Sequence, residues 1–300
     1  MTKRNTALLL LVVLLLLIPL SVSAQAEAGD PDILALMRQI NTQLATQGSN
    51  LAVEEIELFT IGKERPSNRL LQMPFRWVPN DPRRNADGDN ITYLVDQSDG
   101  ATASGLTSAQ TEAAIDRAMT TWDRLTCMKT VDIVKRSDNG ADPDFFDALV
   151  GFGEFGNPYL ADIVNAGWLP RSFFDAATGA PDSVLGFSIT FIFVDDATRE
   201  PTDINGDNYL DTGHNEVYYN DTFGTAGDPR ADLPWGIDVA LPGIDVETVA
   251  LHENGHSLGV THFGPPPDTV MNPVYVGIRQ ELFPIDHAEM CTVWQWWPQK

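Results

Sequence analysis

His252-Glu253-Asn254-Gly255-His256-Ser257-Leu258-Gly259-Val260-Thr261-His262 is the stretch of sequence that decides the fold of this chain. His252 and His256 are four residues apart, so on an α-helix their side chains stand one turn apart on the same face. Glycine adopts positive φ at little cost, so Gly259 can end the helix and turn His262 back toward the other two imidazoles. The spacing therefore predicts a helix and a tight turn that bring three histidines to one point.

The residues before this stretch favour the same helix. Asp245 can act as its N-cap, because an aspartate side chain accepts a hydrogen bond from the first helical turn. Val246, Val249 and Ala250 then follow at the spacing of an apolar helix face and lead into His252.

Three histidine ligands indicate a catalytic zinc ion. Three protein ligands leave a fourth position for water, and bound zinc lowers the pKa of that water to roughly 7. Glu253 follows the first ligand and is not itself one, so we expect it to take a proton from the water and pass it to the leaving amine. The predicted Zn²⁺ ligands are His252, His256 and His262, and the predicted catalytic residue is Glu253.

A second motif follows the histidines. A histidine pair alone is often only a polar surface, and an isolated Met-Asn-Pro is an ordinary turn. After this helix, however, Val270-Met271-Asn272-Pro273 resembles the Met-turn of metzincin zinc proteases, which places a methionine, here Met271, beneath the metal. The chain thus resembles a metzincin, and is most similar to the matrixin-like metalloproteases found in bacteria.

The resemblance implies an α+β domain over residues 85–300. Its twisted, mixed and mostly parallel sheet would carry the active-site helix, with a C-terminal helix after the Met-turn. Residues 91–95 resemble the first strand, 106–125 the first helix and 215–221 the strand before the active-site helix. An edge strand above an open cleft would pair with an extended substrate, and its candidate residues are Val184, Leu185, Gly186, Phe187 and Ser188.

Two features depart from the family pattern. Phe263 follows the third histidine where matrixins usually have serine, so the narrower family is not assigned by the motif. No cysteine precedes Cys127, so the cysteine-containing pro-segment of animal matrixins is missing from this sequence. Latency, if the enzyme has it, would need another device.

The N-terminal residues predict export. Lys3 and Arg4 precede an apolar run from Ala7 to Leu20, and small residues follow, so we expect residues 1–24 to be a cleaved signal peptide. The alternative is a membrane anchor, but a span needs roughly 20 apolar residues and this run is shorter. Residues 25–84, with helical spacing at 31–47 and a strand-like run at 51–59, read as an N-terminal extension or pro-region.

Charge and cysteines agree with an extracellular or periplasmic protein. The net charge of −23 would become −25 after loss of Lys3 and Arg4, which disfavours nucleic acid and anionic membranes as partners. Cys127 and Cys291 predict one disulfide in an oxidising compartment, with two free buried thiols as the alternative.

A second candidate metal site lies in an acidic loop. The loop has oxygen-bearing side chains at positions 1, 3, 5 and 9, as calcium-binding loops do: Asp203, Asn205, Asp207 and Asp211. At position 12, where such loops usually have glutamate, this sequence has His214. We weigh Ca²⁺ binding there against an ordinary solvated turn.

The resulting hypothesis is a secreted zinc endopeptidase that acts as a monomer on protein or peptide substrates. Two alternatives remain: a secreted non-catalytic metal-containing binding protein, and a zinc amidase acting on cell-wall or small amides.

Overall fold

A computed structural model describes residues 28–84, 88–128, 131–153 and 160–295. The predicted signal peptide, residues 1–24, lies outside the described residues. Within them, no helix combines the length and apolar character that a bilayer span requires.

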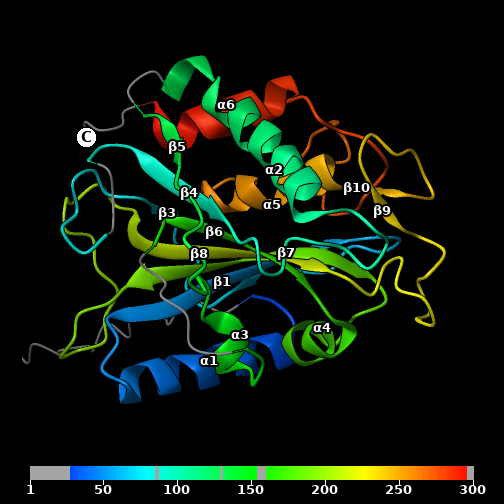
Figure 1. The fold of residues 1–300 in the computed structure, drawn as a ribbon. Helices are drawn as coiled ribbons and strands as arrows, with labels where there is room; N and C mark the ends of the chain where they lie inside the picture. Colours follow the sequence, from blue (N-terminus) through cyan, green and yellow to red (C-terminus); the bar gives the residue numbers. More distant parts are fainter. Residues whose placement is uncertain (1–27, 85–87, 129–130, 154–159, 296–300) are drawn as a thin grey trace, which may run out of the picture.

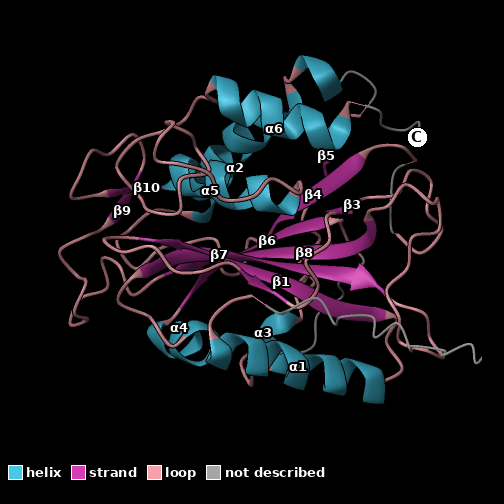
Figure 2. Cartoon of the chain, turned by 180° about the vertical axis from the view of Figure 1, so that it is seen from behind, coloured by secondary structure: helices cyan, strands magenta, loops and turns pink. Residues whose placement is uncertain are grey.

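The fold has three layers, with a central sheet between two groups of helices (Figure 1). Figure 2 shows the same layers from behind. One face carries α1 (Pro31–Thr46), α3 (Phe146–Leu149) and α4 (Arg171–Thr178), and the other carries α2 (Ser108–Asp123), α5 (Val246–Ser257) and α6 (Pro284–Trp294). A short 3-10 helix, η1 (Thr126–Met128), follows α2.

The main sheet is mixed, in the order β2-β1-β7-β8-β6-β4-β5, with β3 also paired to β8. Parallel pairing joins β5 to β4, β4 to β6, and β6 to β8. Antiparallel pairing joins β8 to β7, β7 to β1, and β1 to β2. This confirms the predicted α+β class and sheet type. The strands are β1 (Leu51–Thr60), β2 (Asn68–Arg69), β3 (Phe75–Arg76), β4 (Ile91–Val95), β5 (Ile133–Lys135), β6 (Ile163–Leu169), β7 (Val184–Phe193) and β8 (Leu210–Asn220), with β9 (Trp235–Gly236) and β10 (Ile244–Asp245) forming a separate pair.

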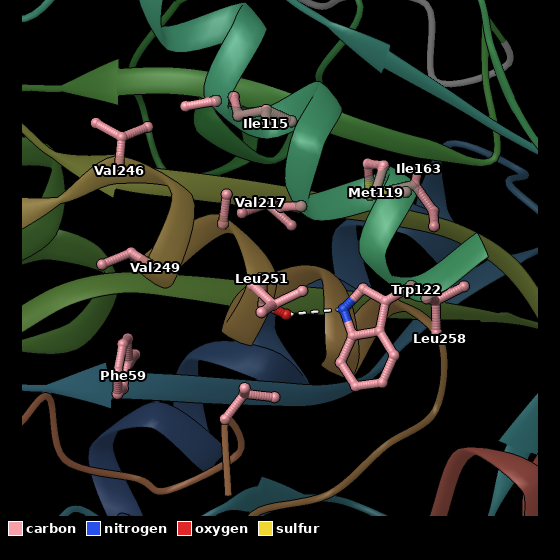
Figure 3. Close-up of a cluster of buried hydrophobic side chains, with 14 of the residues drawn as sticks. Phe59, Ile115, Met119, Trp122, Ile163, Val217, Val246, Val249, Leu251 and Leu258 are labelled. Carbon is pink, nitrogen blue, oxygen red and sulfur yellow. Dashed lines mark hydrogen bonds between the residues drawn. The ribbon is translucent and has the colours of Figure 1, made fainter. Parts of the chain in front are cut away.

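Helix α5 lies between the sheet and α2. Helix α2 begins with a capping box, in which the Thr107 N–H donates to Gln110 Oε1 at 3.0 Å. The indole of Trp122 then donates to the Leu251 carbonyl of α5 at 2.9 Å, inside a cluster of buried apolar side chains (Figure 3). The indole satisfies its only donor there without leaving the core.

The C-terminal helix is joined to this core in two places. The predicted disulfide between Cys127 and Cys291 is present and links η1 to α6. The indole of Trp294 donates to the Leu258 carbonyl, just after α5, at 2.8 Å. Both links hold α6 beside the end of the active-site helix.

The N-terminal segment is built into the sheet. Helix α1 packs on β1, and β1 pairs with β2 on one side and β7 on the other. Residues 28–84, which the sequence suggested to be an extension or pro-region, therefore share a hydrophobic core with the region that follows them.

Candidate metal centre

Helix α5 has the boundaries that its sequence predicts. Asp245 is the N-cap and accepts a hydrogen bond from the Thr248 N–H at 2.9 Å. The helix ends at Ser257, and Gly259 has φ +86°, a left-handed conformation that favours glycine. The chain then turns, and His262 returns to the same helix face.

The three histidines meet at one point. The Nε2 atoms of His252, His256 and His262 are each 3.2 Å from the other two. Three imidazoles at roughly 2.0–2.1 Å from one tetrahedral zinc ion would have nitrogens roughly 3.3 Å apart. The donor set therefore fits zinc, and among the described residues it is the one group of histidine, cysteine or acidic side chains able to share an ion.

Two of the three rings are oriented by a backbone carbonyl at the other nitrogen, Nδ1. His252 Nδ1 lies 2.8 Å from the Val270 carbonyl, and His256 Nδ1 lies 2.9 Å from the Val260 carbonyl. Such partners fix the tautomer that leaves Nε2 free for a metal. In the third ring, His262 Nδ1 lies 3.3 Å from Glu57 Oε2, but this contact lacks the geometry of a hydrogen bond.

The imidazoles are neutral at ordinary pH. Burial lowers the pKa of His252 and His256 well below its usual value, and the neighbouring histidines lower it further. Burial and the positive charge of Arg69 lower the pKa of His262 to about 3. Each ring thus keeps the lone pair that a metal ligand needs.

Glu253 follows His252 in α5 and is fully buried. Neither of its carboxylate oxygens has a hydrogen bond of ordinary geometry to the described residues. Burial raises its pKa well above the usual range, the charge of Glu57 adds to the rise, and the backbone N–H of Phe59 opposes it. An unpaired buried carboxylate is costly, so this group is suited to receive a proton.

Met271 packs against α5 at Gly255. A Cβ atom on Gly255 would lie 2.5 Å from Met271 Sδ and 2.9 Å from the Trp122 ring, so this helix position requires glycine. The Met271 carbonyl accepts from the Phe263 N–H at 2.9 Å, which ties the turn to the residue after His262. The side chain of Phe263 is not used in that contact.

Residues 186–297 match the family model for matrixins. This part of the chain, which carries the three histidines and the Met-turn, is similar to a matrixin domain. A search among curated proteins finds no match. The family supports zinc-dependent peptidase activity in general, in agreement with the three converged histidines.

The predicted substrate strand is not at the sheet edge. Residues 184–188 do lie in β7, but β1 pairs with β7 along its length, with Phe59 opposite Gly186 and Glu57 opposite Ser188. The expectation of an edge strand above an open cleft is therefore wrong for this structure. A segment that is far away in the sequence supplies the missing partner for the backbone groups of β7.

The acidic loop at 203–211 has its own partners. Asp207 Oδ2 lies 2.5 Å from an Arg76 nitrogen, and Asp211 Oδ2 lies 2.7 Å from an Arg83 nitrogen. Both oxygens of Asp203 accept backbone N–H groups of the loop, and Asn205 donates to Asp207. His214, at loop position 12, is buried in β8 against Glu216. The four predicted ligands thus form no convergent group.

Sequence reasoning missed Glu57, Phe59 and Tyr275. Phe59 stacks on His252, with ring centroids 3.8 Å apart and an interplanar angle of 9°. Tyr275 meets the same phenylalanine edge-on at 5.9 Å. The β-forming residues at 51–59 predicted a strand. They contained no signal that this strand lies beside the histidines.

Proposed function

We propose that this matrixin-like chain is a secreted zinc-dependent endopeptidase in which Glu253 is the general base and then the general acid. The observation that carries the proposal is the buried Glu253 carboxylate, which has no hydrogen bond of ordinary geometry to the described residues, on the helix that also carries two of the three converged imidazoles. A purely structural metal site has no use for such a carboxylate.

The chain's own residues define the steps. The ion would be held by His252, His256 and His262. The carbonyls of Val270 and Val260 keep the rings of His252 and His256 in place. When bound, zinc supplies Lewis acidity that activates water and stabilises negative charge on the scissile carbonyl oxygen. Glu253 accepts the proton of the attacking water and donates it to the amine nitrogen as the peptide C–N bond breaks.

The disulfide supports an extracellular or periplasmic location, because disulfides persist in oxidising compartments. The predicted signal peptide at residues 1–24 would direct export. We propose that the enzyme acts as a monomer on proteins or peptides. Calcium at 203–211 remains a proposal, and the arginine pairs of that loop weaken it.

The test compares zinc content and peptide hydrolysis in four proteins: the parent, Glu253→Gln, Glu281→Gln and Phe59→Ala. Glu281 is exposed and provides a matched carboxylate control, and Phe59→Ala is included because Phe59 covers His252. We expect unit zinc in each and chelator-sensitive hydrolysis that only Glu253→Gln abolishes.

Two results would contradict the proposal. Full activity of Glu253→Gln would remove the proposed base. Zinc binding without hydrolysis of any peptide, in both the parent and Phe59→Ala, would favour the binding-protein alternative, and hydrolysis of small amides alone would favour the amidase.

A further inference from the structure

The three histidines of the metal centre differ in how their rings are held. His252 and His256 each have a backbone carbonyl at Nδ1. The Nδ1 atom of His262 has no such carbonyl among the described residues, and its contact with Glu57 lacks the geometry of a hydrogen bond. The position of His262 therefore depends on how the chain on either side of it is fixed.

Both neighbours of His262 are fixed through their backbone N–H groups. The Phe263 N–H donates to the Met271 carbonyl at 2.9 Å. The Thr261 N–H donates to Glu289 Oε1 at 3.1 Å, and the Thr261 hydroxyl donates to the same oxygen at 2.7 Å. Hydrogen bonds to a carboxylate are roughly twice as strong as those between neutral groups. One carboxylate thus fixes the residue before His262 by two hydrogen bonds.

Glu289 belongs to α6 and not to the helix and turn that carry the histidines. It lies 28 residues beyond Thr261 in the sequence. Its other oxygen, Oε2, is buried and has no hydrogen-bond partner of ordinary geometry among the described residues. A buried, unpaired carboxylate oxygen is costly, so this side chain adds little to the stability of the fold. What it provides is the pair of bonds to Thr261.

Two tethers hold α6, and the disulfide is the one nearer to Glu289. Cys291 is two residues further along the helix and is bonded to Cys127 in η1. The Trp294 indole donates to the Leu258 carbonyl at 2.8 Å and holds the far end of the helix. Figure 1 shows α6 on the same side of the sheet as α5. Without the disulfide, α6 would keep its tether at Trp294 and lose the one beside Glu289.

We propose that Glu289 is the positioning residue of the third metal ligand, His262, and that the Cys127–Cys291 disulfide helps the protein to retain its metal by holding Glu289 against Thr261. This inference rests on the proposed zinc-dependent function. It gives the disulfide an effect on the metal centre in addition to its effect on the fold.

Zinc affinity, measured by competition with a chelator, tests the proposal without catalysis. Loss of a partner that orients a ligand weakens metal binding by about ten- to hundred-fold, and we expect a loss of this size from Glu289→Leu. Glu289→Gln keeps an Oε1 acceptor and should restore most of the affinity. Thr261→Val loses the hydroxyl but keeps the N–H, so its affinity should lie between those of Glu289→Leu and the parent.

A double-mutant cycle tests the link between the disulfide and Glu289. Replacement of both cysteines by Cys127→Ser and Cys291→Ser should weaken zinc binding at least roughly two-fold in the parent, and should have almost no effect when Glu289→Leu is already present. Glu281→Leu removes an exposed carboxylate just before α6 and should match the parent. Thermal unfolding of the metal-free proteins reports whether each variant is folded.

Unchanged zinc affinity in folded Glu289→Leu and Thr261→Val, a Glu289→Gln protein as weak as Glu289→Leu, or additive losses in the cycle would overturn the proposal. A parent protein that binds no zinc would overturn it together with the proposed function. If the affinities follow the expected pattern but the zinc-loaded parent cuts no peptide, the proposed function fails and the role of Glu289 stands.

Discussion

The segment from His252 to His262 and the loop from Asp203 to Asp211 both have the residue spacing of metal sites, yet only the first brings its side chains together. The three Nε2 atoms lie 3.2 Å from one another. In the loop, Asp207 and Asp211 bond instead to Arg76 and Arg83.

The difference lies in what sets the side-chain positions. In the first segment a helix, its cap and one glycine fix two ligands locally and return the third. In the loop, the partner of Asp207 is 131 residues away in sequence, and β3 brings it there by pairing with β8. Residue spacing therefore predicts a metal site well where the helix and turn alone position the ligands. It predicts one less well where arginines from distant parts of the sequence compete with a metal ion for the same carboxylate oxygens.

The largest expected effect removes one of the converged ligands. We expect His256→Ala to reduce zinc from about one ion per chain to almost none and to abolish hydrolysis, because two ligands cannot form the site. Metal analysis and a peptide assay measure both quantities. Retention of a full zinc equivalent would show that the three imidazoles do not act together.

A second change breaks the arginine pairing beside the loop. Arg83→Met leaves the buried Asp81 and Asp211 carboxylates without their cation, and such a loss costs about 3 kcal/mol of unfolding free energy. Urea unfolding measures the cost. The exposed Arg124→Met should be nearly neutral, and an equal loss in both variants would argue against a specific role for Arg83.

A smaller effect concerns the support of the metal site. Asp286 accepts from the Val270 N–H at 3.2 Å and from the Thr269 hydroxyl, and thereby holds the carbonyl that orients His252. We expect Asp286→Asn to weaken zinc binding by about ten- to hundred-fold. Competition with a chelator reports this affinity, and the exposed neighbour Asp268→Asn should match the parent.

The smallest expected effect is the change in melting temperature when calcium is added to the parent protein. Since arginines already neutralise Asp207 and Asp211, millimolar calcium should leave the melting temperature almost unchanged. In Arg83→Met, where Asp81 and Asp211 are freed, calcium should raise it measurably. A large rise in the melting temperature of the parent protein with calcium would instead support the loop as a calcium site.

Much of the fold could be predicted from local pattern. The active-site helix begins at its predicted cap, Asp245, and the strand at 91–95, the helix after Thr107 and the last helix after Met271 occur where the resemblance to metzincins places them. The position of β1 could not be predicted in this way. Its alternation indicates a strand, but many strands have such a pattern, and the neighbour is chosen by non-local hydrogen bonds.

The sequence alone was enough to predict the active-site helix and the convergence of His252, His256 and His262, because turn-by-turn geometry is encoded within a few residues. Their role as zinc ligands and that of Glu253 as the base remain predictions. Tertiary structure alone decided that Arg76 and Arg83 neutralise the acidic loop and that Phe59 covers His252. Those contacts join residues separated by more than a hundred positions, and they form only when the sheet has assembled.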